Sequence, residues 1–266
     1  MNIRYLLLIF LAPCLLHAEE EQGKKTLLSR PLIIGASLSA GFNQQDMIGP
    51  KSRKLAFDRH LDKALIGPHG EIKNKGNILL FMAPLEQAED QIKFAEDYQP
   101  SVTFAPDFLF WFLYGDNHQE EAQRLKSLEL GLAKLDRIHG PLIVATIPNA
   151  KEAAGGMLGG PQIPQPQTLT KANARIQEWA KAREENGTKT GVLDLYRLHQ
   201  DLVQEKESKL GDLLVTPQQA KNSLQSDKLH PTIKGANLIA LFTLKTLQQT
   251  SPFDNALVNW KISETK

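Results

Sequence analysis

Short apolar runs alternate along the chain with longer segments in which apolar residues recur at helical spacing. Each run is bounded by glycine, proline or polar residues, a pattern typical of buried strands. We predict strands at 32–34, 77–82, 101–105, 141–147 and 191–195. The amphipathic segments predict helices within 55–65, 86–98, 120–138, 171–183 and 235–247. This alternation predicts an α/β fold: a three-layer α/β/α sandwich with a five-stranded, mainly parallel sheet between two helical layers.

Ligands of such sheets bind beyond the carboxyl ends of the strands. We therefore look for chemistry in the loops after the first, third and fifth predicted strands. The glycine- and proline-rich segment 155–166 follows the fourth strand, and it is either a plain connector or a lid over the site. Because we find no internal repeat and no second domain, we predict a single domain over 19–266 with its core at about 30–250.

Residues 1–18 have the layout of a secretory signal peptide. A short positive segment precedes the almost wholly apolar stretch 5–16, and Ala18 stands before three glutamates. The stretch is too short to span a bilayer, which takes about 20 apolar residues. We expect cleavage after Ala18, a secreted or periplasmic protein, and no membrane span in the mature chain. The alternatives are an uncleaved leader and a lipid anchor on Cys14, and the proline before that cysteine disfavours the anchor.

Composition narrows the function classes. The 266 residues are 41% hydrophobic and carry a net charge of +1, which is typical of a soluble globular protein and disfavours a nucleic-acid partner. Cys14 is the only cysteine, so the mature chain has no disulfide, no thiolate nucleophile and no cysteine zinc site. Several histidines lack paired metal spacing, and we interpret them as surface or helix residues, with no metal and no cofactor expected. They are His60, His69, His118, His139 and His199.

A serine directly follows the first predicted strand. In Gly35-Ala36-Ser37-Leu38, small residues allow a sharp turn that projects the serine hydroxyl at the rim of the sheet. A hydroxyl beside its own backbone N–H suits a nucleophile whose amide helps to hold an oxyanion. Serine and glycine are also ordinary turn residues, so this segment alone leaves both interpretations open.

An acid and a histidine stand three residues apart before the last predicted helix. Asp227 precedes His230, which is followed by a proline. At this spacing the carboxylate can orient one ring nitrogen and leave the other free to take a proton from a serine. The same pair can instead cap the helix, and the spacing favours neither interpretation.

Together the two segments resemble the SGNH/GDSL hydrolases. The resemblance lies in Gly-Ala-Ser-Leu-Ser-Ala-Gly at 35–41 and, more specifically, in Ser-Asp-Lys-Leu-His-Pro-Thr-Ile-Lys-Gly at 226–235. It spans nearly the whole mature chain, because the order of strands and helices between the two blocks also fits. The resemblance implies a flavodoxin-like SGNH hydrolase fold and a triad of the nucleophile Ser37, the base His230 and the acid Asp227.

The chain departs from the family pattern around the oxyanion. Ala36 replaces the usual aspartate, no glycine follows the second predicted strand, and Asp107 takes the position of the family's oxyanion-binding asparagine. An ionised Asp107 repels an oxyanion, whereas a protonated one can donate a hydrogen bond to it. Alternatively, Asp107 turns away and the Ser37 N–H works with another amide. Asn117 is a further candidate donor.

Two other positions keep two interpretations each. Trp111 belongs to the aromatic run 108–114, which forms either an apolar wall for the substrate or part of the core. Asp194 ends the fifth predicted strand and is either a rival acid or a residue that shapes the following turn.

These motifs predict an exported serine hydrolase that cleaves carboxylic esters through an acyl-enzyme. The expected substrate is a small-molecule or glycan ester, with its acyl group on a sugar, a lipid or a small alcohol. Two alternatives stay open. One is an O-acyltransferase, in which a sugar hydroxyl replaces water. The other is a non-catalytic or weakly active carbohydrate- or lipid-binding protein on a degenerate scaffold, which the missing glycine and Asp107 favour.

Overall fold

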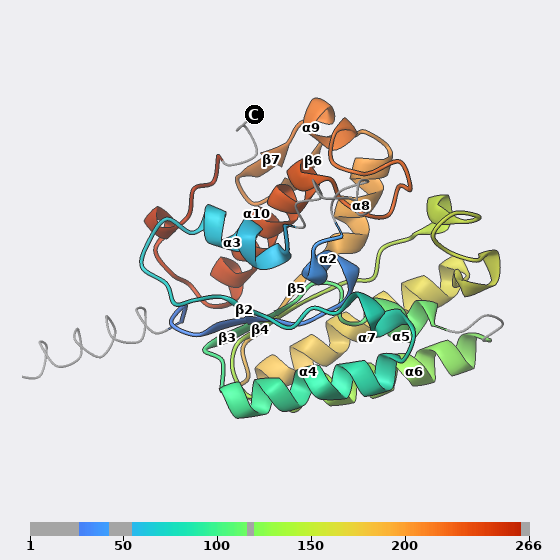
Figure 1. Cartoon of the computed structure of the whole chain (residues 1–266), viewed down its shortest axis with the longest axis horizontal. Coiled ribbons are helices and arrows are strands. Elements are labelled where there is room, and N and C mark those ends of the chain that lie inside the picture. Colours follow the sequence, from blue (N-terminus) through green and yellow to red (C-terminus); the bar gives the residue numbers. More distant parts are fainter. Residues whose placement is uncertain (1–26, 43–54, 116–119, 262–266) are drawn as a thin grey trace, which may run out of the picture.

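The computed structural model describes residues 27–42, 55–115 and 120–261. Its central sheet has the strand order β2-β1-β3-β4-β5, and all neighbouring strands are parallel (Figure 1). The strands are β1 (Pro31–Ile33), β2 (Lys73–Asn74), β3 (Val102–Ala105), β4 (Leu142–Ala145) and β5 (Thr190–Leu193). The predicted α/β class and the five-stranded sheet are therefore confirmed, and the sheet is wholly parallel.

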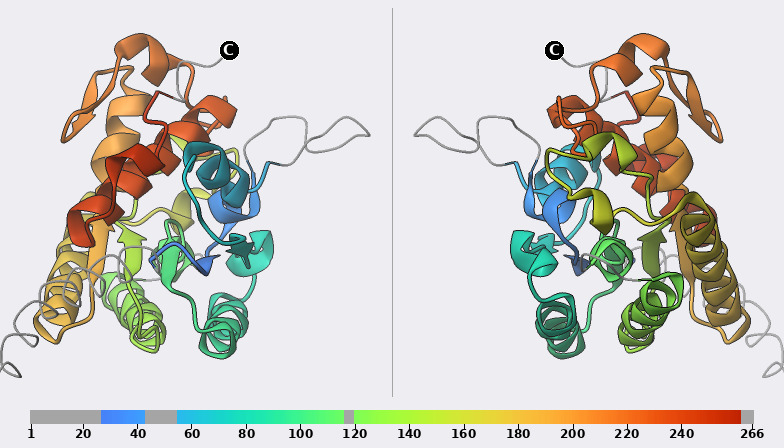
Figure 2. Two further views of the ribbon diagram at one scale, coloured as in Figure 1. Left: turned by 90° about the vertical axis from the view of Figure 1, so that its left-hand side faces the viewer. Right: turned by 90° about the vertical axis from the view of Figure 1, so that its right-hand side faces the viewer.

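Helices cover both faces of the sheet. One layer contains α4 (Pro84–Tyr98), α6 (Glu121–Leu135) and α7 (Pro166–Glu185), and the other contains α3 (Phe57–Ala64), α8 (Leu195–Val203) and α10 (Ile233–Thr250). Both views in Figure 2 show the sheet between these layers. Side chains alternate between the two cores, since Leu32 packs in the core under α4 and α6 while Ile33 packs in the core under α3 and α10. The three-layer sandwich is confirmed.

The second predicted strand, 77–82, is wrong. Ile78–Phe81 forms the 3₁₀ helix η2, and the strand that pairs with β1 lies earlier, at Lys73–Asn74. The Asn77 side chain accepts a hydrogen bond from the Leu79 N–H at 2.9 Å and so begins the helical turn. Short apolar runs do not distinguish a strand from a buried helical turn.

The five predicted helices are present with shifted ends, and the pattern missed several shorter elements. These are α2 (Ser37–Ala40), α5 (Phe110–Tyr114), α8, α9 (Pro217–Lys221), the 3₁₀ helices η3 (Lys151–Ala153), η4 (Gly160–Gln162) and η5 (Asn255–Leu257), and the antiparallel hairpin of β6 (Ser208–Leu210) and β7 (Leu213–Val215). In the described part of the chain, no helix combines the length and apolar character needed to cross a membrane.

The segment 155–166 is held against the helical layer. The buried Arg124 side chain donates hydrogen bonds to the carbonyl oxygens of Pro161 and Gln162 at 2.7 and 2.9 Å. No residue of the segment lines the pocket beside Ser37 that is described below. Of the two interpretations of this segment, the structure favours the connector.

Candidate active site

A sharp turn between β1 and α2 presents Ser37 at the carboxyl edge of the sheet. Gly35 occupies this turn with φ +148°, a conformation that side chains rarely adopt. A Cβ atom at Gly35 would lie 2.1 Å from Asp107 Oδ1 and 2.4 Å from Ser39 Oγ, so only glycine fits. The turn leaves Ser37 as the first residue of α2, half-buried and lining a pocket.

Asp227 and His230 belong to one tight turn before α10. The backbone N–H groups of Leu229 and His230 both donate to Asp227 Oδ1, each at 3.0 Å. Lys228, between them in the chain, adopts the left-handed conformation with φ +57°. The Gln225 N–H donates to the His230 carbonyl at 2.8 Å and closes the turn. The short spacing seen in the sequence therefore corresponds to a locally bonded unit.

The structure brings Ser37, His230 and Asp227 together in one chain of hydrogen bonds. His230 Nδ1 lies 2.7 Å from Asp227 Oδ2, and His230 Nε2 lies 3.1 Å from Ser37 Oγ. Burial acts to raise the pKa of the Asp227 carboxyl, but its bonds to the His230 ring and to two backbone N–H groups together hold that pKa below its ordinary value. An ionised Asp227 accepts a hydrogen bond from the Nδ1–H group, so Nε2 is free to accept the Ser37 proton.

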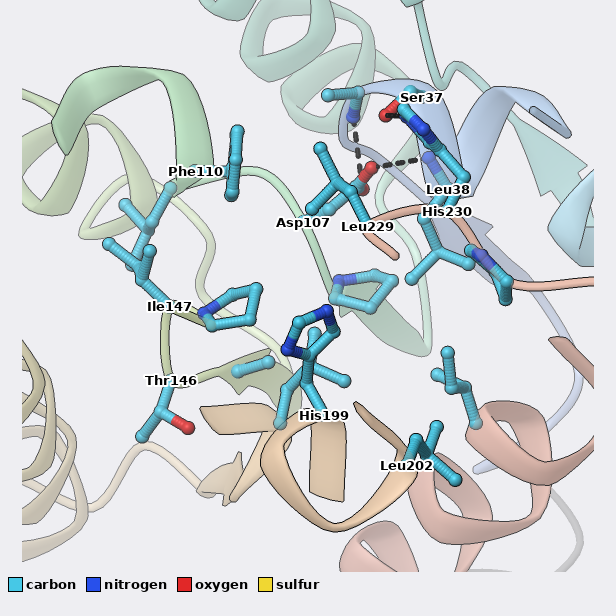
Figure 3. Close-up of a pocket in the computed structure, with 18 of the residues that line it drawn as sticks. Ser37, Leu38, Asp107, Phe110, Thr146, Ile147, His199, Leu202, Leu229 and His230 are labelled. Carbon is cyan, nitrogen blue, oxygen red and sulfur yellow. Dashed lines mark hydrogen bonds between the residues drawn. The ribbon is translucent and has the colours of Figure 1, made fainter. Parts of the chain in front are cut away.

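Asp107 faces the start of α2 and acts as an acceptor. One of its oxygens, Oδ2, accepts from the Leu38 N–H at 2.7 Å and the Ser39 N–H at 3.4 Å, and Oδ1 accepts from the Ala36 N–H at 3.0 Å. The Ser39 hydroxyl lies 2.6 Å from Oδ1. Figure 3 shows two of these bonds. Desolvation raises the pKa of Asp107, and the bonds to α2 oppose that rise only in part.

A glycine does follow the true second strand, which corrects the sequence-based prediction. Gly76 lies just after β2, and its added Cβ would come within 2.6 Å of Ser39 Cβ. Its N–H donates to Asn74 Oδ1 at 2.8 Å, and Asn74 Nδ2 donates to the Ser39 carbonyl at 2.8 Å. The residues after β2 thus contact α2 at Ser39, in addition to the bonds from Asp107.

The backbone N–H of Ser37 is the predicted oxyanion donor that lies within the described residues. Among the described residues, no acceptor binds the backbone N–H of Ser37, which leaves it available to a ligand in the pocket. Asn117, the other predicted donor, lies outside the described residues.

Trp111 and Asp194, for which the sequence left two interpretations each, both make contacts within the fold. The Trp111 ring packs against Phe110 and Phe81 at centroid distances of 5.0 and 5.7 Å, and it does not line the pocket, whereas Phe110 does. Most of the aromatic run is buried in the core. Asp194 caps α8 by accepting from the Arg197 N–H at 3.2 Å, which favours its turn-shaping interpretation.

The pocket beside Ser37 is mostly apolar. Its volume, on the scale used for protein cavities, is about 60 Å³. Figure 3 shows that its walls come from α2, the loops after β3 and β4, α5, α8 and the turn before α10. The lining residues are Ala36, Ser37, Leu38, Pro106, Asp107, Leu109, Phe110, Ala145, Thr146, Ile147, Pro148, Leu195, His199, Leu202, Leu224, Leu229, His230, Pro231 and Ile239.

Sequence reasoning missed His199, which lies in α8 and is buried rather than at the surface. Its Nε2 donates to the Lys228 carbonyl at 2.9 Å, and its Nδ1 has no hydrogen-bond partner among the described residues. Desolvation is the main cause that lowers the pKa of His199 to about 4, so the ring is neutral at neutral pH. The signal was present in the chain, because His199 continues the apolar stripe of Leu195, Leu198 and Leu202 at helical spacing.

Over the described ranges, no cluster of three or more histidine, cysteine or acidic residues has the arrangement of a metal site. His60 is a second buried histidine, and its Nδ1 lies 2.6 Å from Asn237 Oδ1 on α10. That bond links α3 to α10 within one helical layer, which is a structural role.

Comparison with known proteins identifies the fold. No family model and no curated protein matches the chain. A protein from Parabacteroides merdae described as a GDSL-like lipase superposes with a TM-score of 0.52 at 11% identity, over 82% of this chain and 95% of that one. An acetylxylan esterase from Geobacillus stearothermophilus gives a TM-score of 0.51 at 14% identity, over 88% and 98% of the two chains. The resemblance predicted from the sequence is thus confirmed at the level of the fold: the chain has the α/β fold of these GDSL-like structures.

Proposed function

We propose that this protein is a serine hydrolase that cleaves carboxylic esters, with Ser37 as its nucleophile. The observation that carries the proposal is the unbroken chain from Asp227 through the His230 ring to the Ser37 hydroxyl, with distances of 2.7 and 3.1 Å. An imidazole that bridges a carboxylate and a hydroxyl is the arrangement that activates a serine. The fold shared with structures described as a lipase and esterases supports the same reaction class.

The proposed reaction proceeds by proton transfer between Ser37 and His230. His230 Nε2 takes the Ser37 proton as Ser37 Oγ bonds to the ester carbonyl carbon, and Asp227 stabilises the imidazolium that forms. The alcohol leaves with the proton from His230, so that the acyl group stays on Ser37. Water then attacks the acyl carbon and gives a proton to His230. The bond between that carbon and Ser37 Oγ breaks, and His230 returns the proton to Ser37 as the acid leaves.

The oxyanion is held, in this proposal, by the Ser37 N–H. Asp107 binds neighbouring N–H groups and so fixes the start of α2 instead of donating to the oxyanion. Loss of one oxyanion donor typically costs about 10²–10³ in rate. We therefore expect turnover below that of a hydrolase with a full set of donors.

A fluorophosphonate probe tests the proposal directly, because it bonds to an activated serine hydroxyl. We expect the purified protein to be labelled, and the labelling to disappear in Ser37→Ala and His230→Ala. Ser127→Ala and His139→Ala are matched controls, since both residues lie away from the pocket. Labelling that survives in Ser37→Ala would contradict the proposal.

A non-catalytic binding protein is the second candidate, and the acceptor role of Asp107 is the observation that favours it. A wild-type protein that folds cooperatively but takes no label would support this candidate over the hydrolase. For a labelled protein, product analysis with and without an added acceptor alcohol separates hydrolysis from acyl transfer.

We also propose export through the leader 1–18, which lies outside the described residues. The charged start, the apolar stretch and the residues around Ala18 support it. Expression of the full chain, followed by N-terminal sequencing of the exported form, tests this point. A mature protein that begins at Glu19 is expected, whereas retention of Met1 in the cytoplasm would contradict it.

A further inference from the structure

We propose that Gln91 is a positioning residue for Ser37, because its side-chain amide fixes the turn from which the nucleophile projects. This inference rests on the proposed function, since the rate of ester cleavage depends on where the Ser37 hydroxyl lies. It goes beyond that function by assigning part of the rate to a side chain of α4 that belongs to neither the triad nor the pocket lining.

Both backbone polar groups of Gly35 are bound by the Gln91 amide. The Gly35 N–H donates to Gln91 Oε1 at 2.8 Å, and Gln91 Nε2 donates to the Gly35 carbonyl at 2.9 Å. Gln91 is 3% exposed and belongs to the buried side of α4, whose other buried residues are Ala88, Ile92 and Ala95. An amide buried among apolar side chains is costly unless it is hydrogen-bonded. Because the two bonds engage both ends of the amide, they fix the orientation of the Gly35 backbone.

Gly35 depends on this amide because it lies where strand pairing ends. The Ile34 N–H still donates to the Phe104 carbonyl at 2.9 Å, which continues the pairing of β1 with β3. The next N–H, that of Gly35, has no backbone acceptor among the described residues. The Gly35 carbonyl also accepts from the Asn77 N–H at 2.9 Å. Loss of the Gln91 amide therefore leaves the Gly35 N–H without an acceptor at the point where the chain leaves the sheet.

The orientation of the Gly35 turn decides where Ser37 lies. Ser37 is two residues further along the chain, and its Oγ has to stay near the 3.1 Å that separates it from His230 Nε2. Asp107 binds the N–H groups on both sides of Ser37, whereas Gln91 holds the peptide groups that precede them. A misplacement of about 1 Å can lower the rate of an enzyme by about 10². We therefore expect Gln91 to act on kcat through the position of Ser37.

Asn173 on α7 provides a matched control, because its amide makes the same pair of bonds at a different loop. The Ile147 N–H donates to Asn173 Oδ1 at 2.7 Å, and Asn173 Nδ2 donates to the Ile147 carbonyl at 3.0 Å. Ile147 follows β4 and carries no group of the proposed triad. Loss of either amide removes two bonds to the backbone and is expected to lower stability. Only the loss at Gly35 is expected to displace the nucleophile.

The first test compares Gln91→Met with Asn173→Leu, each of which replaces an amide by an apolar side chain of similar size. With p-nitrophenyl acetate as substrate, we expect kcat of folded Gln91→Met to fall by about 10- to 100-fold and KM to change by less than about threefold. For Asn173→Leu we expect kcat within about threefold of the wild type, because no reacting group moves. Urea unfolding of both variants separates a loss of rate from a loss of folded protein.

The second test uses pH, and it decides the question if Gln91→Met does not fold. In Gln91→Glu the new carboxyl donates to the Gly35 carbonyl only when it is protonated, and burial raises its pKa. Asp107 binds the next N–H of the turn and titrates in both proteins, so the quantity to follow is the ratio of kcat to that of the wild type. We expect this ratio to rise by about threefold or more from about pH 8 to about pH 5.5, and the ratio for Asn173→Asp to stay constant.

Fluorophosphonate labelling of the wild type separates the two proposals. If the protein is labelled but Gln91→Met keeps kcat within about threefold, or Asn173→Leu loses as much, Gln91 does not position Ser37 while the proposed function stands. A loss confined to KM, or a ratio for Gln91→Glu that does not change with pH, also overturns the inference. A protein that takes no label and cleaves no ester overturns both.

Discussion

Two aspartates near Ser37 bind backbone N–H groups in a similar way, yet their environments shift their pKa values in opposite directions. Asp227 accepts from its own turn, within three residues along the chain, while Asp107 accepts from α2, 68 to 71 residues away. The pKa of Asp227 is held below its ordinary value, and desolvation raises the pKa of Asp107.

The partners explain the contrast. Asp227 has an imidazole at 2.7 Å that can take up a positive charge, and that bond favours the carboxylate. Asp107 meets only neutral dipoles, the N–H groups and hydroxyl at the start of α2, and these do not fully offset its desolvation. Asp227 is thus suited to charge changes during a reaction, and Asp107 to holding the backbone that carries Ser37.

The largest expected effect separates the two roles by rate. In Asp227→Asn the amide nitrogen faces His230 Nδ1, which then has to be the acceptor, so Nε2 carries the proton and no longer accepts from Ser37. We expect ester hydrolysis to fall by about 10⁴, as in other Ser-His-Asp triads. Steady-state rates and the rate of fluorophosphonate labelling measure the loss. A decrease of less than tenfold in a folded variant would remove Asp227 from the proposed mechanism.

The second prediction concerns stability. Asp107→Ala leaves the N–H groups of Ala36 and Leu38 without their acceptor, at a cost of about 1–3 kcal/mol each. We expect the free energy of unfolding in urea to fall by about 3 kcal/mol in total. Asp90→Ala is the control, because Asp90 is exposed on α4. Equal stability of the two variants would show that Asp107 does not hold α2.

The third prediction uses pH, where the two aspartates act with opposite sign. The folded state binds fewer protons at Asp227 than the unfolded state, so this carboxylate stabilises the fold above its ordinary pKa of 3.8, and the contribution disappears as pH falls through the lowered pKa. At Asp107 the folded state binds more protons, so stability is lost as pH rises from 3.8 through the raised pKa.

Urea unfolding between about pH 3 and pH 7 resolves these trends when each variant is compared with the wild type, because contributions from other groups then cancel. The stability deficit of Asp227→Asn is expected to shrink toward acid pH, and that of Asp107→Asn to shrink toward neutral pH. Parallel curves for the two variants would refute the opposite pKa directions.

The contrast between local bonds at Asp227 and long-range bonds at Asp107 also shows which parts of the structure the sequence predicts. The turn from Asp227 to His230 is bonded within itself, so one short segment contains the residues that set its geometry, although the spacing alone left a triad and a helix cap equally open. The alternation of strands and helices likewise predicted the sheet, because local periodicity reflects which side faces a core. The orientation of Asp107 could not be predicted, because its partners at the start of α2 lie 68 to 71 residues away and are brought near by the parallel pairing of β1 and β3.

Two other features were not predicted for the same reason, namely that they depend on contacts between distant segments. The apolar run at 77–82 satisfies a strand pattern, but β2 is a pair of polar residues whose position depends on pairing with β1. His199 looked like an ordinary helix residue, and only the packing of α8 beneath the turn at Lys228 makes it part of the pocket. Contacts between distant segments carry no short-range sequence signal.

The smallest expected effect concerns Phe42, which connects the start of α2 to the turn that carries His230. Its N–H donates to the Ser37 carbonyl at 2.8 Å, its carbonyl accepts from the Gln225 side chain at 3.1 Å, and its ring lies 4.1 Å from the His230 ring. An aromatic pair contributes about 0.5–1.5 kcal/mol beyond its buried area.

Phe42→Leu keeps the backbone bonds and removes only the ring contact, so we expect kcat to fall by about three- to tenfold with KM unchanged. Phe42→Tyr retains the ring and is expected to restore the rate. Phe81→Leu is the matched control, because Phe81 is 48% exposed and its ring contacts Trp111 outside the pocket. If both leucine variants slow hydrolysis equally, or if the loss appears in KM, the ring of Phe42 does not position His230, and the turn and α2 are joined by their backbone bonds alone.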